Sequence, residues 1–185
     1  MKKIIISLAL VVMACQSQAQ DKYFTKTGKI YFDATTPASP EKIEGTNKSV
    51  TCVIDSKTGN LQFSVLMKGF EFERALMEEH FNENYVESSK YPKTEFRGQV
   101  TDNSTVNYHA DGVYPVKVKG KMNLHGVSKD VETSGKITIK GGKIIASAAF
   151  AIVLADYNVS IPTLVSDKVS KNASITVECV MEPLK

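Results

Sequence analysis

Hydrophobic and polar residues alternate along much of this chain, and the alternation is most regular between Tyr114 and Lys140. Over residues 114–124 apolar side chains take nearly every second position, and lysines take most of the positions between them. After a break at residues 126–129, the same period returns over residues 131–140. This pattern predicts a β-hairpin with one buried and one solvated face, as in an antiparallel sheet.

The same period of two predicts strands on either side of this hairpin. These strands are expected over residues 21–36, 47–55, 61–67, 96–100, 144–154 and 175–181. Within the first of them, the alternation places one set of residues on a common face: Phe24, Lys26, Gly28, Ile30 and Phe32. In the strand at 144–154 the second face is also apolar, carrying Ala149, Ala151, Val153 and Ala155. A strand that is apolar on both faces is expected to be covered on both faces.

One segment departs from the strand period. Between Phe70 and Tyr85 the apolar residues recur at spacings of about three and four, mixed with glutamates, which is a helical period. We therefore expect one helix, or two short ones, over residues 73–82. Pro92 bounds this segment, because the residue before a proline is held extended.

Together these elements predict an all-β fold of about eight antiparallel strands with a short helical insert. Short connections between consecutive strands suit either a sandwich or an up-and-down barrel. Closure into a barrel removes exposed strand edges. A barrel of about eight strands has an interior that is filled with side chains or holds one small ligand.

The beginning of the chain is expected to direct export. Two lysines, Lys2 and Lys3, precede an apolar run over residues 4–13 that is too short to span a bilayer. Small residues before Gln20 fit cleavage by a signal peptidase at that point. Residues 1–19 would then be a signal peptide and residues 20–185 the mature barrel domain.

A second processing route competes with this cleavage. Residues 12–15 have the form of a lipobox, in which Cys15 would become a lipidated N-terminus, although Met13 is unusual there. Cleavage before Gln20 predicts a periplasmic or secreted protein, whereas lipidation predicts a membrane-anchored lipoprotein. Neither route leaves a transmembrane segment.

The charge balance and the positions of the histidines argue against two kinds of function, nucleic-acid binding and metal binding. The chain has 23 basic and 20 acidic residues, so its composition gives no reason to expect nucleic acid as a partner. Its three histidines, His80, His109 and His125, lie far apart and form no metal-ligand spacing, so we expect no metal or cofactor. His125 lies where a strand gives way to a turn, and a structural hydrogen bond to the loop is its expected role.

The remaining reactive residues give no catalytic pattern. Cys52 and Cys179 each lie in an apolar alternating run, so they fit a disulfide of an exported protein or two buried free thiols. The chain has no Gly-x-Ser-x-Gly elbow and no phosphate-binding loop. The glutamates of the helical segment fit a solvated face better than paired acid–base catalysts.

The candidate ligand-binding residues are bulky apolar side chains on the faces expected to point inward. They are Phe63, Val65, Met67, Phe96, Met122, Leu124, Phe150, Ile152 and Leu154. From the residues alone, a packed core is favoured over a cavity wall.

Four segments of the chain follow one another in a recognisable order. They are residues 77–92 (MEEHFNENYVESSKYP), 96–98 (FRG), 118–129 (VKGKMNLHGVSK) and 156–162 (DYNVSIP). In order and spacing they resemble the YceI-like lipid/polyisoprenoid-binding family of exported bacterial proteins. The likeness extends over nearly all of the chain after the export signal, and residues 118–129 are its most specific part.

The resemblance implies a lipocalin-like, eight-stranded antiparallel barrel with a hydrophobic interior cavity. It also implies that the cavity binds a long-chain apolar molecule, of the polyisoprenoid or fatty-acyl type, in the periplasm. For the nine candidate residues it therefore favours a cavity wall over a packed core.

Three functions remain open from the sequence. The first is a non-catalytic carrier of a long apolar chain. The second is an enzyme that modifies such a lipid, which would need a positioned acid, base or nucleophile. The third is a structural or stress-linked envelope protein whose barrel is filled by its own side chains.

Overall fold

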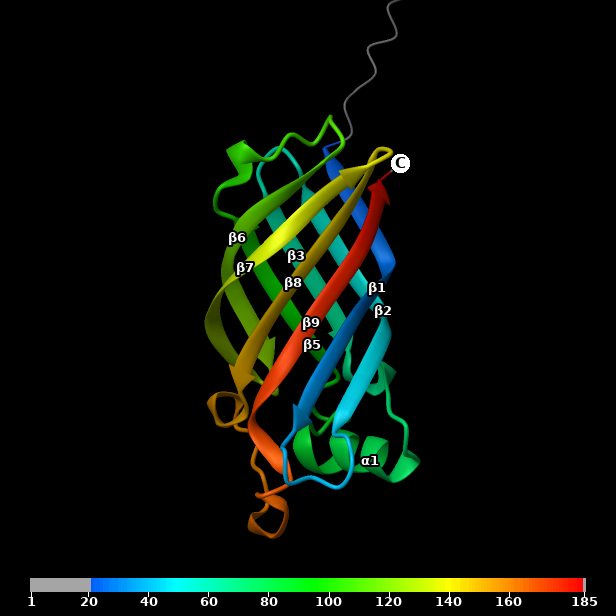
Figure 1. Cartoon of the computed structure of the whole chain (residues 1–185), viewed down its shortest axis with the longest axis vertical. Helices are drawn as coiled ribbons and strands as arrows, with labels where there is room; N and C mark the ends of the chain where they lie inside the picture. Colours follow the sequence, from blue (N-terminus) through cyan, green and yellow to red (C-terminus); the bar gives the residue numbers. More distant parts are fainter. Residues whose placement is uncertain (1–20, 185) are drawn as a thin grey trace, which may run out of the picture.

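The fold, in a computed structural model that describes residues 21–184, is an antiparallel sheet closed into a barrel (Figure 1). The strands are β1 (Lys22–Thr35), β2 (Glu44–Asp55), β3 (Asn60–Leu66), β4 (Phe70–Glu71), β5 (Lys93–Val100), β6 (Gly112–Leu124), β7 (Val127–Lys140), β8 (Lys143–Val153) and β9 (Val169–Pro183). The helical segments are α1 (Ala75–His80), the π-helical turn η2 (Phe81–Tyr85), and the 3-10 turns η1 (Met67–Gly69), η3 (Asn103–Thr105), η4 (Leu154–Tyr157) and η5 (Thr163–Val165). The expected signal peptide, its cleavage point and Cys15 lie outside the described residues.

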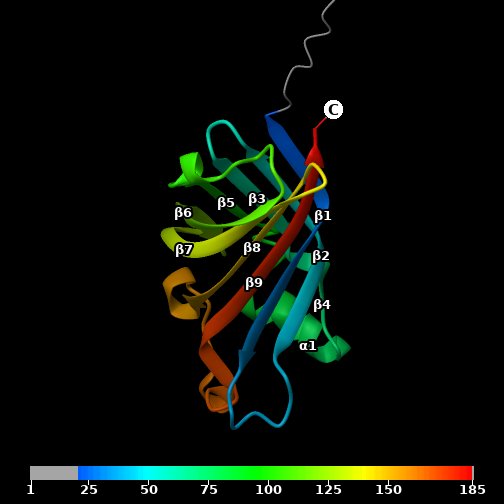
Figure 2. The same ribbon diagram turned by 45° about the horizontal axis from the view of Figure 1, so that its top comes forward.

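Each strand of the barrel pairs with the next one along the chain, apart from the short β4. The sheet order is β1-β9-β8-β7-β6-β5-β3-β2-β4, and a further pairing of β1 with β2 closes the ring. The prediction of an eight-stranded antiparallel up-and-down barrel is therefore confirmed, with β4 added as a short extra strand beside β2. Figure 2 shows β1, β2, β8 and β9 along one side of the barrel, with α1 at its lower end.

The β6–β7 hairpin follows the predicted pleat. Val118 and Leu124 are buried, whereas Lys117 and Lys119 are exposed. The turn is shorter than expected, because Leu124 already pairs with Val127. Only His125 and Gly126 form it, with φ of 52° and 75°, which are the positive values that a two-residue type I′ turn requires. The expected break at residues 126–129 is therefore wrong.

The face predicted for β1 is correct only in its second half. The register with β2 shifts between Thr25 and Gly28, as it does at a β-bulge. Thr25 is buried before this shift and Phe32 after it, so the inward face changes phase. Phe24 and Lys26, which we placed on the same face as Phe32, lie on the outer side instead.

The expectation that β8 is covered on both faces is also wrong. Ala149, Ala151 and Val153 are exposed, and Val153 retains 45% of its accessible surface. The helix does not lie over this strand, because α1 and η2 lie at one end of the barrel (Figure 1). Short apolar side chains expose little apolar surface to water, so the outer face of β8 needs no covering layer.

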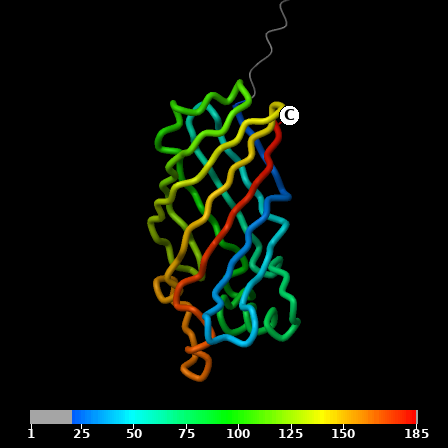
Figure 3. Tube along the Cα trace, viewed as in Figure 1, coloured from blue at the N-terminus to red at the C-terminus, as the bar shows by residue number. Residues whose placement is uncertain are grey.

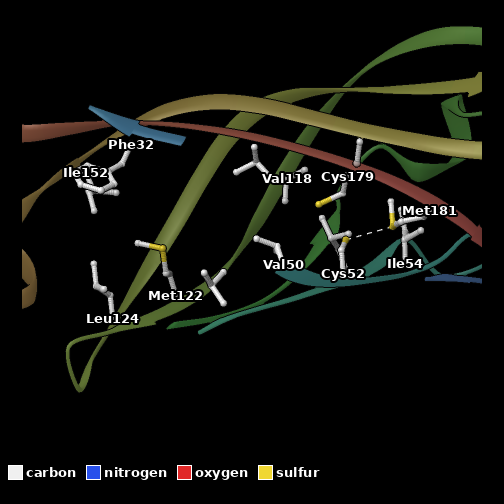
Figure 4. Close-up of a cluster of buried hydrophobic side chains, with 14 of the residues drawn as sticks. Phe32, Val50, Cys52, Ile54, Val118, Met122, Leu124, Ile152, Cys179 and Met181 are labelled. Atoms are coloured by element: carbon white, nitrogen blue, oxygen red, sulfur yellow. Dashed lines mark hydrogen bonds between the residues drawn. The ribbon is translucent and has the colours of Figure 1, made fainter. Parts of the chain in front are cut away.

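The other end of the barrel is filled by tightly packed side chains. Cys52, Ile144, Cys179 and Met181 are fully buried, and the Cys52 thiol lies 3.3 Å from the Met181 sulfur (Figure 4). Both cysteines are free. A Cβ atom on Gly28 would lie 2.4 Å from the Cys179 sulfur, so the glycine in β1 makes room for this cluster. Burial and the adjacent Cys179 thiol raise the pKa of Cys52 well above its usual range.

Two adjacent isoleucines of β8 test this packed end directly. Ile144 is fully buried, and Ile145 faces outward and is half-buried. We expect Ile144→Ala to lower the free energy of unfolding by about 2–5 kcal/mol, because it leaves a void in the packed end. Ile145→Ala should cost much less, and urea denaturation followed by circular dichroism measures both. Equal losses for the two variants would contradict the assigned faces.

Candidate functional site

An apolar cavity of about 220 Å³ occupies the interior of the barrel. Its wall includes strand residues, such as Val118, and residues at the end near α1 and η4, such as Phe81 and Leu154. The fully buried residues Cys52, Ile144, Cys179 and Met181 do not line it. Side chains therefore fill the barrel at one end, where Figure 4 shows Cys52, Cys179 and Met181 close together, and the cavity lies toward the other end.

All nine candidate residues lie on the wall of this one cavity. They come from different elements: Phe63 and Val65 from β3, Met67 from η1, Phe96 from β5, Met122 and Leu124 from β6, Phe150 and Ile152 from β8, and Leu154 from η4. Alternation along the strands brings them together from distant parts of the sequence. Their contact with a ligand stays a prediction.

Sequence reasoning missed the residues that close the cavity near α1. Phe32, Phe70, Phe72 and Phe81 line this end, and five pairs of their rings have centroids 5.0–5.6 Å apart. We call these four residues the phenylalanine plug. Three of them belong to the apolar positions of the helical segment, and only the folded barrel places them beside Phe32. Tyr85 of η2 joins the same wall, and burial raises the pKa of its hydroxyl.

The cavity offers few polar groups. Thr94 and Thr133 lie on its wall, and their hydroxyls donate to the Met67 sulfur at 3.1 Å and to the carbonyl oxygen of Ser134 at 3.2 Å. Lys136 reaches the wall, but it belongs to the outer face of β7 and is exposed. Such a wall can hold a hydrocarbon chain by burying it, with almost no hydrogen bonds to its polar end.

Two of the three histidines lie away from this cavity. His80 and His109 are exposed, away from the wall. In residues 21–184, no three side chains of His, Cys, Asp or Glu come together as a set that could hold a metal ion.

His125 joins three loops at the η4 end of the barrel. Its Nδ1 lies 3.0 Å from the carbonyl oxygen of Tyr157, and its Nε2 lies 2.7 Å from a carboxylate oxygen of Glu87. The ring of Tyr91 packs edge-on against it at 4.6 Å. A carbonyl oxygen only accepts hydrogen bonds, so Nδ1 donates to Tyr157. The structural hydrogen bond expected for His125 is confirmed.

The backbone around the contacts of His125 is strained. Among residues 21–184 three non-glycine residues have positive φ: Glu87 (44°), His125 (52°) and Asn158 (56°). Two of them, Glu87 and His125, contact each other through their side chains, and the third follows Tyr157, the acceptor of the His125 hydrogen bond. Left-handed backbone at non-glycine residues persists where surrounding contacts hold it. We call the contact of Glu87, His125 and Tyr157 the histidine clasp.

A model of the YceI-like domain matches residues 22–181, which is most of the chain. The chain belongs to the YceI-like family. This membership agrees with the barrel, with its apolar interior and with the segments that first indicated it. No curated protein sequence matches the chain.

Three solved structures have a similar YceI-like fold. A polyisoprenoid-binding domain from Saccharophagus degradans, implicated in plant cell wall breakdown, superposes with a TM-score of 0.76 at 14% identity, over 90% of this chain and 100% of that one. BcnA from Burkholderia cenocepacia gives 0.66 at 15% identity, over 83% and 95%. The YCEI protein from Campylobacter jejuni gives 0.54 at 20% identity, over 78% and 88%. At these identities the likeness establishes the fold.

No membrane-spanning helix accompanies this YceI-like barrel in the described chain. None of the helices in residues 21–184 combines the length and the apolar character needed to cross a bilayer.

The histidine clasp should contribute measurably to stability. We expect His125→Asn to lower the free energy of unfolding by about 1–3 kcal/mol, because both ring contacts are lost while asparagine still tolerates positive φ. His109→Asn is the matched control, since His109 is exposed. Urea denaturation measures both, and an unchanged midpoint for His125→Asn would contradict a stabilising clasp.

Proposed function

We propose that this YceI-like protein is an exported, non-catalytic carrier that holds a long-chain apolar molecule, of the polyisoprenoid or fatty-acyl type, inside its barrel. The observation that supports this function is the almost wholly apolar cavity in the hollow part of the barrel. The name of the Saccharophagus domain, which describes polyisoprenoid binding, supports the same ligand class.

The physical basis of the proposed binding is transfer of hydrocarbon out of water. Each buried methylene contributes about 0.8 kcal/mol, so a chain that fills the cavity with several such groups binds without any charged contact. The polar end of the ligand would stay outside, because the wall has no charged group pointing inward to receive it. No covalent step is part of this function.

The two alternative functions, a lipid-modifying enzyme and a structural envelope protein, fit this site less well. A lipid-modifying enzyme would need a base or nucleophile in the cavity, and the threonine hydroxyls of the wall already donate to other atoms. A structural envelope protein with a filled barrel would leave no cavity between the plug and the packed end.

Purification from the native host tests the proposal as a whole. Native mass spectrometry of the protein from periplasmic and membrane fractions should show a bound species whose mass fits a polyisoprenoid or fatty-acyl compound. Chemical conversion of that compound by the purified protein would establish the enzyme instead. A protein that is empty, and that also fails to take up a long-chain fatty acid when titrated, would favour the filled barrel.

A charge inside the cavity should weaken binding. Ile152 is buried on the cavity wall, so Ile152→Asp places a carboxylate where it is neither paired nor hydrated. We expect the affinity for cis-parinaric acid, a fluorescent fatty acid, to fall about tenfold or more. Val180→Asp is the control, because Val180 is 44% exposed on the outer face of β9. Circular dichroism and thermal melts should show that both variants are folded. Unchanged affinity of folded Ile152→Asp protein would refute binding in the barrel interior.

The proposed location of the protein depends on how its N-terminus is processed. We expect the mature protein to begin at Gln20, and Cys15→Ser then leaves a soluble periplasmic product unchanged. Cell fractionation with mass spectrometry of the mature N-terminus measures this. Membrane attachment that disappears in Cys15→Ser would show that the lipoprotein route operates instead.

A further inference from the structure

Packed side chains lie at both ends of the barrel. At one end Cys52, Ile144, Cys179 and Met181 leave no accessible surface. At the other end, beside α1, the rings of the phenylalanine plug pack against one another. A ligand that moved along the barrel axis would have to pass one of these two packed sets.

The wall of the barrel is interrupted between β7 and β8. Their antiparallel pairing runs from Lys140 opposite Lys143 to Gly135 opposite Ala148 and stops there. Residues 127–134 of β7 still pair with β6, and residues 149–153 of β8 still pair with β9, but these two segments do not pair with each other. Figure 3 shows the two traces running together from their connecting turn and then separating. We call this interruption the β7–β8 fork.

The cavity extends to both sides of the fork. Val131, Thr133 and Gly135 contribute to its wall from β7, and Ala148, Phe150 and Ile152 contribute from β8. Val131, Thr133 and Phe150 are only partly buried, whereas Ile137 and Ile139, in the paired part of β7, are buried. The side chains at the fork are therefore mostly apolar and incompletely covered.

A second place where neighbouring strands separate, between β2 and β3, is bridged by a hydrogen bond. β2 pairs with β3 only from Thr51 onward, and its earlier part pairs with β4. The fully buried Asn47 bridges this separation, since its side-chain nitrogen donates to the carbonyl oxygen of Leu66 at 2.9 Å. At the β7–β8 fork, no comparable hydrogen bond joins residues 127–134 to residues 149–153.

The open side of the fork ends at η4 and the histidine clasp. η4 follows β8 directly and packs against β7, so it crosses between the two diverging strands. The hydrogen bond between His125, in the turn that begins β7, and the carbonyl oxygen of Tyr157 fixes η4 in this place. Glu87 in turn holds the second nitrogen of His125.

We propose that the ligand enters and leaves the cavity sideways through the β7–β8 fork, with η4 as a gate that the histidine clasp holds closed. This inference rests on the proposed function, since it concerns the path of the same apolar ligand. Passage between two unpaired strand segments breaks no strand-to-strand hydrogen bond and leaves the packed end and the phenylalanine plug intact. Releasing η4 widens the opening, and it costs the clasp and the burial of Tyr157.

Cross-linking across the fork tests this path. If the register of β7 and β8 continued, Ser134 would lie opposite Ala149, and both face outward. Ser134→Cys/Ala149→Cys protein, joined by a short bismaleimide, should release cis-parinaric acid about tenfold or more slowly while its equilibrium affinity stays close to the original. Stopped-flow fluorescence measures the release rate, and intact mass confirms the cross-link.

Two controls isolate the fork. The same double variant capped with N-ethylmaleimide carries the substitutions without the link. Ala151→Cys/Ser174→Cys places an identical link across β8 and β9, where these residues already pair. Release from both controls should be within about twofold of the original protein. A fork-linked protein that binds and releases the probe at the original rate would overturn the lateral path.

The gate has its own test in the same assay. His125→Asn removes both contacts of the clasp and should accelerate release by about threefold or more, whereas exposed His109→Asn should not. Unchanged release from folded His125→Asn protein would overturn the gate. If the original protein does not bind the probe at all, the proposed function fails, and this outcome is distinct from binding with an unaltered release rate.

Discussion

β1 pairs with β2 along one edge and with β9 along the other, and this double pairing closes the sheet into a barrel. An open sheet of this length would present two rows of unpaired backbone groups, which invite association with other chains. Closure removes both edges and defines an inside. The alternation of side chains along each strand then becomes an alternation between water and a shared interior.

The interior is filled unevenly, and this asymmetry determines what the barrel can do. Gly28 leaves room for the Cys179 side chain beside β1, and sulfur-containing and branched side chains fill this end of the barrel. Toward α1 the side chains leave a cavity that is almost wholly apolar. A site of this kind discriminates among ligands by the length and shape of their hydrocarbon, because it offers few directed hydrogen bonds. Long-chain lipids of more than one class are therefore compatible with it.

How far the sequence predicts this structure depends on the regularity of each segment. The β6–β7 hairpin alternates without interruption, so its inward and outward faces follow from the period of two. β1 contains a bulge, and the pattern has no sign of the phase change after Thr25. The exposed outer face of β8 was misjudged because small apolar residues do not need a covering layer. These errors concern individual strands. The predicted barrel is still correct, because in most strands the side chains alternate between the two faces as expected.

The strand residues of the candidate site could be predicted from the sequence, but the contacts at the end of the cavity could not. Alternation alone assigned Met122 and Ile152 to the interior, although only the structure separates a cavity wall from a packed core. The phenylalanine plug and the histidine clasp each join segments that are distant in sequence. Such contacts depend on how loops fold over the end of the barrel, and hydrophobic periodicity has no information about this.

The central claim, that an apolar chain occupies the hollow part of the barrel, can be tested by titrating methyl-labelled protein with a fatty acid that carries a nitroxide on its chain. The spin label broadens nearby methyl resonances. The account predicts that the methyl groups of Leu124 and Ile152 broaden strongly, while those of Ile144 in the packed end and Val180 on the outer face remain sharp. Strong broadening of Val180, with Leu124 and Ile152 unaffected, would place the ligand outside the barrel and contradict the account.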